Sequence, residues 1–159
     1  MSDITIRFAG PEDGDALAAM IDAMDRYYGD PERPAGEARA AVELWLRDGA
    51  CPTRFVLGFA AGAPLGYASF TVVRPGSGLR GLMFLKDVFV MAEHRGQGVG
   101  ERIMQFLAEF CARQGLGHID WVVETERSQQ FYERLGATLQ PHKHFMRLGG
   151  QALADLAAK

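Results

Sequence analysis

The spacing of apolar and polar side chains divides the first half of the chain into segments of different period. Residues 4–8, ITIRF, alternate apolar and polar positions, which is typical of a half-buried strand. Residues 10–28 place Pro11 and three acidic residues before apolar positions that recur every three or four residues, so we expect a helix. A second amphipathic helix fits residues 35–48. Residues 53–73 form two β-rich runs separated by the letters AAGAP, the pattern of a hairpin.

The second half of the chain begins with a nearly continuous apolar run. Residues 82–90, LMFLKDVFV, predict a strand that is buried on both faces. In residues 99–114 the apolar positions recur at i, i+4, i+7 and i+8, the stripe of a helix packed on a sheet. Beyond it the pattern predicts a strand at 118–123, a short helix at 125–136, a last strand at 142–148 and a terminal helix at 151–158.

Strands and helices in this order predict an α/β (α+β) fold. We expect a mixed sheet with helices on both faces and, at its centre, a parallel strand–helix–strand crossover. The chain has 159 residues and a mass of 17.4 kDa, the size of one domain, and it contains no internal repeat or domain-scale linker. We therefore predict a single domain over residues 1–159.

Composition excludes several classes of protein. Apolar residues make up 48% and charged residues 23% of the chain, unlike a disordered or fibrous protein. The first ten residues lack the basic and apolar regions of a signal peptide, so we expect a cytoplasmic protein with no membrane partner. Cys51 and Cys111 supply neither a disulfide framework nor a pair of metal ligands at the usual spacing, so we expect no metal.

The acidic residues are concentrated in one segment. The net charge of −3 disfavours binding to nucleic acid, because a phosphate backbone is held chiefly by clustered Lys and Arg. Between Glu12 and Asp48 there are ten acidic residues and four arginines, a local balance of −6. Such a segment either attracts a cation or forms a solvated helix face.

The letters EHRGQGVG at residues 93–100 place three glycines between the predicted strand at 82–90 and the predicted helix at 99–114. A glycine-rich turn before a helix exposes backbone N–H groups at the positive end of the helix dipole, and no Cβ holds an anion away from them. Arg95 adds a guanidinium suited to charge-assisted hydrogen bonds with phosphate. This pattern predicts an anion site, and the alternative is a mobile turn with a helix cap.

Three phosphate-binding patterns compete for this turn. The nucleoside-triphosphate loop requires Gly-Lys followed by Ser or Thr, whereas Gly100 is followed by Glu101-Arg102. The dinucleotide fingerprint G-x-G-x-x-G fails from either starting glycine. Glu124 nevertheless lies near where a ribose-binding acid is expected, so a dinucleotide-binding domain stays an alternative. The third pattern, R/Q-x-x-G-x-G/A, is satisfied by Arg95, Gly98 and Gly100.

Together with a second motif, FYERLGA at residues 131–137, these residues resemble the GNAT superfamily of acetyl-coenzyme A (acetyl-CoA) dependent N-acetyltransferases. The resemblance covers the chain from the strand at 4–8 to roughly the letters FMRL near residue 148. It implies a mostly antiparallel sheet and direct transfer of an acetyl group from acetyl-CoA to a primary amine in a ternary complex. It also implies a homodimer, although no residue of the sequence indicates one.

The resemblance further implies which residues contact acetyl-CoA. The amides between Arg95 and Gly100 hold the pyrophosphate, and the preceding strand binds the pantetheine arm, with one amide polarising the thioester carbonyl. Thr125 stands where the family often has Asn, and Ser128 occupies a small-residue position. The predicted cofactor-binding residues are Phe89, Val90, Arg95, Gly96, Gln97, Gly98, Val99, Gly100, Thr125 and Ser128.

The catalytic residues follow from the same resemblance. Tyr132 matches a tyrosine that protonates the departing thiolate in many relatives, and its alternative role is that of a core tyrosine. An ammonium must lose a proton before it attacks, so a base is required. Lys86 holds the position of the glutamate that is the base in polyamine-type relatives. Asp87 and Glu124 are the predicted replacements, and an ion pair is the alternative role for Asp87.

In the family the first two helices wall the acceptor pocket, and in this chain they form the acidic segment. Asp25, Tyr28 and Lys86 are the predicted substrate-binding residues, and a small cationic amine such as a polyamine or an amino acid is the predicted acceptor. The alternative to an enzyme is a CoA-binding or regulatory module with weak catalysis, which is consistent with Lys86 at the position of the base.

Overall fold

The computed structural model describes residues 3–47, 51–76 and 79–159. The chain separates into two compact units, Met1–Trp121 and Val122–Lys159. The last residue of the helix predicted over 35–48 lies outside the described residues. The single domain over residues 1–159 stays a prediction.

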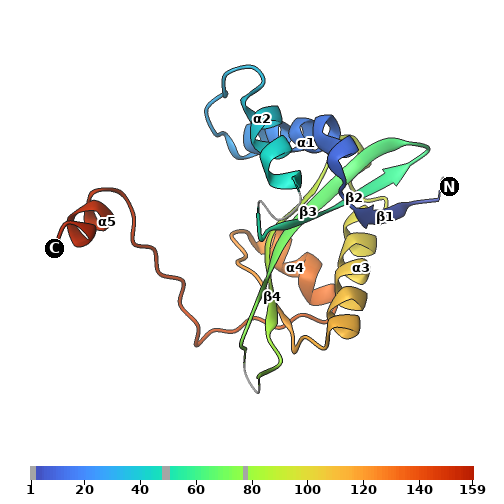
Figure 1. The fold of residues 1–159 in the computed structure, drawn as a ribbon. Coiled ribbons are helices and arrows are strands. Elements are labelled where there is room, and N and C mark those ends of the chain that lie inside the picture. The colour runs from blue at the N-terminus through green and yellow to red at the C-terminus, as the bar shows by residue number, and fades with distance from the viewer. Residues whose placement is uncertain (1–2, 48–50, 77–78) are drawn as a thin grey trace. The chain divides into compact units, whose positions relative to one another are not determined.

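The first unit is built on one five-stranded sheet (Figure 1). Its strands are β1 (Thr5–Phe8), β2 (Arg54–Ala60), β3 (Ala63–Val73), β4 (Leu82–Val90) and β5 (Ile119–Asp120). They lie in the order β1-β2-β3-β4-β5, and every neighbouring pair is antiparallel except the parallel pair β4 and β5. This mixed sheet confirms the predicted fold class, but its parallel pair stands at the end of the strand order and not at the centre of the sheet, where we expected it.

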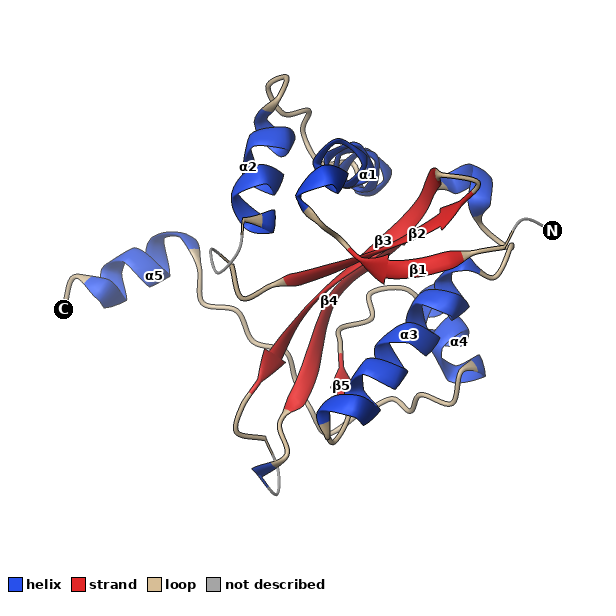
Figure 2. Cartoon of the chain, turned by 45° about the vertical axis from the view of Figure 1, so that its right-hand side comes forward, coloured by secondary structure: helices blue, strands red, loops and turns tan. Residues whose placement is uncertain are grey.

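Helices cover both faces of the sheet, as predicted (Figure 2). One face carries α1 (Gly14–Tyr28) and α2 (Glu37–Leu46), and the other carries α3 (Val99–Gln114), which connects β4 to β5. Short 3-10 turns precede two of them, η1 (Pro11–Asp13) before α1 and η3 (Ala92–His94) before α3. Within the described ranges, no helix has the length and apolar character needed to cross a membrane.

Each face of the sheet has its own apolar core. The core under α1 and α2 contains Leu17, Met20, Ile21, Val42, Phe55, Leu57, Tyr67 and Phe89. The core under α3 contains Val56, Ala68, Phe70, Met83, Leu85, Ile103, Leu107 and Phe110. Because side chains alternate along a strand, neighbouring residues of β2 and β3 enter opposite cores. Full burial of one large apolar side chain contributes about 1.5–3 kcal/mol.

A β-bulge in β4 changes which core its side chains enter. The pairing of β3 with β4 runs Ser69↔Asp87 and then Phe70↔Leu85. Lys86 is therefore an extra residue without a partner on β3. Leu85 belongs to the core under α3, whereas Phe89 belongs to the core under α1 and α2. With a strict period of two, the side chains of Leu85, Asp87 and Phe89 would all lie on one face of the sheet. The extra residue Lys86 reverses the alternation after Leu85, so Asp87 lies on the face of Phe89, toward α1 and α2.

The second unit contains α4 (Glu126–Arg134) and α5 (Gly150–Ala157), and no strand lies among residues 122–159. The strand predicted at 118–123 is shortened to β5, and the strand predicted at 142–148 is wrong. Phe145 and Met146, which helped to predict it, are 64% and 89% exposed. A strand needs a neighbour for its backbone hydrogen bonds, and an alternating composition does not supply one.

Candidate active site

The glycine turn before α3 has the backbone that its composition predicts. Gly96 and Gly98 adopt φ of 75° and 82°, the left-handed region that glycine enters at low cost. A Cβ at either position would meet no atom within 4 Å, so the space above the turn is not filled by neighbouring atoms of the first unit. The first helical hydrogen bond runs from the Arg102 amide to the Gly98 carbonyl, at 3.0 Å. The amides of residues 99–101 precede it and lie at the positive end of the helix dipole.

The Arg95 side chain anchors this turn to its surroundings. Its Nε donates to the carbonyl oxygen of Val90 at 3.0 Å. Its guanidinium carbon lies 4.3 Å from the ring centroid of Tyr27 on α1 and 5.6 Å from that of Phe89. The side chain of Gln97 likewise donates to the Glu93 carbonyl, at 2.9 Å. The contact with Tyr27 was not foreseen from the sequence, because adjacent aromatic residues at a helix end carry no signal of a distant arginine.

Within the first unit, one edge of β4 is open beside this turn. In the described residues β5 pairs only with Met83 and Phe84, so the edge from Leu85 to Val90 has no strand partner on that side. The amide of Met91 donates to the Leu65 carbonyl on β3, at 2.9 Å. Backbone groups of successive strand residues point to opposite edges, so those of residues 88 and 90 face the open edge. The Arg95 contact with the Val90 carbonyl agrees with this direction.

Phe89 lies between these two residues, and its backbone faces β3. Its side chain is 6% exposed, and its ring centroid lies 6.4 Å from that of Tyr67 and 6.3 Å from that of Tyr27. Phe89 therefore shapes the wall under α1, while the amides of Val88 and Val90 are the ones available along the edge.

Asp87 lies on the sheet face that α1 and α2 cover, directly after the bulge residue Lys86. The hydroxyl of Ser69, which is 2% exposed, donates to Asp87 Oδ2 at 2.6 Å. The ammonium of Lys86 is 3.1 Å from Oδ1, and the Lys86 side chain is 69% exposed. Both carboxylate oxygens of Asp87 thus have a donor, one buried and one at the surface.

Tyr67 on β3 contacts both β4, through Phe89, and the acidic helix α1, through Met24. Its side chain is 1% exposed, and its hydroxyl donates to the sulfur of Met24 at 3.1 Å. Burial raises the pKa of Tyr67 far above its usual value, and the negative charges of Asp87 and Asp25 raise it further. The Tyr67 hydroxyl therefore stays protonated, and it marks the place where α1, β3 and β4 converge.

Most of the acid in the segment between Glu12 and Asp48 is paired with arginine. The paired side chains are Glu12 and Asp13 with Arg7, Asp22 and Asp25 with Arg33, and Asp15 and Glu43 with Arg39. The predicted substrate residue Asp25 is 13% exposed at its side chain and contacts Arg33 directly. Tyr28 is 60% exposed, with its ring centroid 5.2 Å from that of Tyr27. Much of the acid in this wall is therefore held in ion pairs, and Arg33 and Arg39, two of the three pairing arginines, are already counted in the balance of −6.

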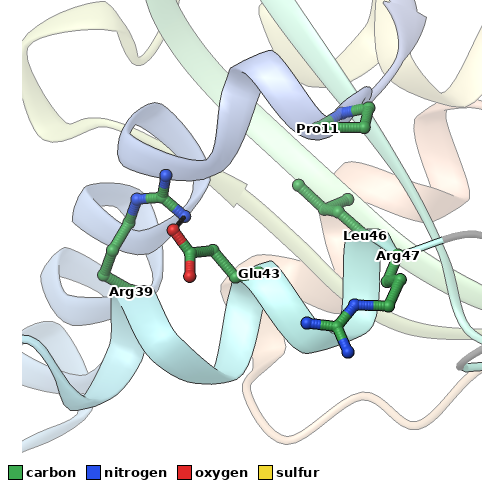
Figure 3. A pocket seen from close by; sticks show the side chains of 5 residues that line it. All are labelled: Pro11, Arg39, Glu43, Leu46 and Arg47. Atoms are coloured by element: carbon green, nitrogen blue, oxygen red, sulfur yellow. Dashed lines mark ion pairs between the residues drawn. The ribbon is translucent and has the colours of Figure 1, made fainter.

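A cavity of about 390 Å³ lies beside α2 (Figure 3). It is lined by Pro11, Arg39, Glu43, Leu46 and Arg47. None of the residues predicted from the sequence to bind acetyl-CoA or the acceptor lines it. The Arg39–Glu43 ion pair beside it, at 2.8 Å, joins two residues of α2 with the spacing of an ordinary helix-surface pair.

The remaining predicted residues belong to the second unit. Thr125 is the N-cap of α4: its hydroxyl accepts from the Ser128 amide at 3.2 Å, and the Ser128 hydroxyl donates to the Thr125 carbonyl at 2.9 Å. Glu124 precedes the cap and is exposed. The ring of Tyr132 packs edge-on against Phe131, with centroids 4.9 Å apart. Across the described ranges, no three His, Cys, Asp or Glu side chains gather in a way that could hold a metal.

Comparison with known proteins agrees with this arrangement. The model of the acetyltransferase (GNAT) family matches residues 17–137. Thialysine N-epsilon-acetyltransferase of Bos taurus is 34% identical over 85 residues, which are 48% of this chain and 48% of that protein. The L-methionine sulfoximine/L-methionine sulfone acetyltransferase of Pseudomonas aeruginosa is 37% identical over 79 residues, 48% of this chain and 45% of that protein. The chain spans about half the length of the curated relatives it matches.

Among solved structures, an integron cassette protein from the mobile metagenome of V. cholerae is similar over nearly its whole length. The TM-score is 0.86 at 25% sequence identity, and the match covers 100% of this chain and 99% of the other.

Proposed function

Because the chain belongs to the acetyltransferase (GNAT) family, we propose that it transfers an acetyl group from acetyl-CoA to the primary amine of a small acceptor. The transfer is direct, with both substrates bound at once. The observation that carries this proposal is the open edge of β4, which leads through Arg95 into a left-handed glycine turn at the start of α3.

The residues of the first unit fit acetyl-CoA at two places. The unfilled space above Gly96 and Gly98, bounded by the first amides of α3, suits a pyrophosphate. The amides of Val88 and Val90 suit the pantetheine arm, which pairs with the open edge as an added strand does. Acetyl-CoA, when bound, supplies the activated acetyl thioester. Arg95 holds the end of β4 and the turn in one geometry, so both groups of donors are positioned before the ligand arrives.

Asp87 is the proposed base. A primary amine is protonated at neutral pH and must transfer a proton before its lone pair can attack. Asp87 presents a carboxylate on the α1 and α2 face, at the edge of the strand proposed to bind acetyl-CoA. Glu124 stays a second candidate in the other unit. Tyr132 is the proposed donor to the departing thiolate, and its support is the resemblance of residues 131–137 to the family motif.

We propose that the acceptor is a small amine of the amino-acid class. The two curated relatives described above are named for acceptors that are amino acids, thialysine and methionine sulfoximine or sulfone. On this chain the predicted substrate residue Asp25 carries Arg33 beside it. A wall with both charges suits an acceptor that carries a carboxylate as well as an amine. Location in the cytoplasm stays an expectation from the sequence, and assembly as a homodimer stays an expectation from the family resemblance.

The test is release of free thiol from acetyl-CoA in the presence of a panel of amines, read colorimetrically. The panel contains diamines, basic amino acids and neutral amino acids, and a reaction without amine measures background hydrolysis. We expect amine-dependent release, with at least one amino acid among the best acceptors. The second candidate function is a CoA-binding module, which Lys86 at the position of the family base favours. Binding of CoA by calorimetry without turnover on any amine would support that module instead.

A further inference from the structure

Ser69 is a buried residue, and packing alone does not require a polar side chain at its position. Among the described residues, Asp13 and Ser69 are the polar or charged residues that are buried. Asp13 is explained by Arg7, which donates to it at 2.6 and 2.7 Å. Ser69 lies in β3 between Ala68 and Phe70, where burying a hydroxyl carries a desolvation cost that alanine would avoid.

The partner of the Ser69 hydroxyl is Asp87. The two residues are opposite each other in the β3–β4 register, and their oxygen atoms are 2.6 Å apart. This distance is typical of a hydroxyl that donates to a charged carboxylate, which is about twice as strong as a neutral hydrogen bond. The bulge at Lys86 creates the pair, because it turns Asp87 to the face on which Ser69 lies.

The other oxygen of Asp87 is accessible to an ammonium group. The Lys86 ammonium is 3.1 Å from Oδ1, while its side chain is 69% exposed. An ion pair this exposed adds little stability, and a competing amine can displace it. The Lys86 ammonium therefore shows where a primary amine reaches the carboxylate.

We propose that Ser69 is a positioning residue for acetyl transfer, whose hydroxyl fixes Oδ2 of Asp87 so that Oδ1 receives the proton of the acceptor. This inference rests on the proposed function. The acceptor ammonium gives one proton to Oδ1, and its freed lone pair forms the new bond to the acetyl carbon. As the carbon–sulfur bond breaks, CoA leaves as the thiolate, and this thiolate takes up the second proton that the nitrogen loses when the amide forms. Asp87 then loses the proton to solvent, and Ser69 keeps its own throughout.

The test compares Ser69→Ala, Ser69→Thr, Asp87→Asn and the double variant Ser69→Ala/Asp87→Asn in the thiol-release assay. Thr71→Val is the matched control, because it removes a hydroxyl from the same strand. The hydroxyl of Thr71 has the Thr53 hydroxyl as its partner, at 3.4 Å. We expect Ser69→Ala to lower kcat about tenfold, with the KM for acetyl-CoA unchanged. Ser69→Thr restores most of kcat, and Thr71→Val stays within about twofold of the wild type.

The double variant decides whether Ser69 acts through Asp87. In the Asp87→Asn background, Ser69→Ala should cause no further loss of kcat. An equal loss in both backgrounds, or a loss that follows the melting temperature alone, would show a merely structural role and overturn the inference. A wild-type kcat retained in Ser69→Ala, with Asp87→Asn inactive, would overturn it while leaving the proposed function intact. Absence of turnover by the wild-type protein on every amine would overturn the proposed function itself, and this inference with it.

Discussion

Gly98→Ala separates the folding role of the glycine turn from its role in binding. Gly98 adopts φ of 82°, and a Cβ built on it meets no atom within 4 Å. The folded protein therefore bears only the conformational cost of a left-handed alanine, about 1–2 kcal/mol. In a chain of 159 residues, each kcal/mol lowers the melting temperature by about 2–4 °C. The added methyl enters the space proposed for the pyrophosphate, so we expect the Kd for CoA to rise at least tenfold, about 1.4 kcal/mol.

Gly115→Ala is the matched control for this change. Gly115 follows the other end of α3, adopts φ of 64° and likewise has no atom within 4 Å of a built Cβ. Both variants should lose similar stability in thermal unfolding without ligand, while calorimetric titration with CoA shows weakened binding for Gly98→Ala alone. If the two variants bind CoA equally well, the turn before α3 does not hold the pyrophosphate, and the placement of acetyl-CoA proposed here is wrong.

Three further changes test other parts of the proposed function. Tyr132→Phe removes the proposed donor to the thiolate, so kcat should fall about 10²-fold or more with little change in the KM for acetyl-CoA; steady-state kinetics with equal turnover for both proteins would exclude the role. Arg33→Ala leaves Asp25 without its cation, so the ratio of kcat/KM for a diamine to that for an amino acid should rise; an unchanged ratio would show that this wall does not select the acceptor. The pKa of Asp13 is held below its usual value chiefly by hydrogen bonds from Arg7. The ion pair of Asp13 with Arg7 therefore stabilises the fold at pH values above the unfolded-state pKa of about 4. This contribution is lost as pH falls through the lower folded-state pKa. The free energy of unfolding, measured with denaturant at several pH values, should show this loss in the wild type and a weaker one in Asp13→Ala. The same pH dependence in both proteins would contradict the prediction.

Periodicity located α1, α2 and α3 because each of these helices buries apolar residues on one face. The spacing of Leu17, Met20 and Ile21 predicts the face that α1 packs on the sheet, and the structure buries all three. The glycines of the turn were likewise informative, because left-handed backbone strongly restricts the choice of residue. Local conformational rules were sufficient for both features.

Features that depend on a distant partner could not be predicted in the same way. The segment at 142–148 has an alternating composition but lacks a pairing strand, so its pattern was misleading. The composition of the first two helices indicated an acidic segment but not its pairing, in which Arg33 contacts Asp22 and Asp25. The contact of Arg95 with Tyr27 joins residues from separate elements, and no short-range pattern encodes it.

The bulge at Lys86 places the proposed base, Asp87, next to the strand edge proposed to bind acetyl-CoA. Continuous pairing would place Asp87 in the apolar core under α3, where a charged carboxylate would be costly to bury. One unpaired residue moves it to the opposite face, next to Ser69 and toward α1. The same strand then presents its free amides along the open edge only a few residues farther on. A single insertion in β4 thus sets the proposed base and the proposed acetyl-CoA edge at a fixed separation, which neither substrate has to organise by binding.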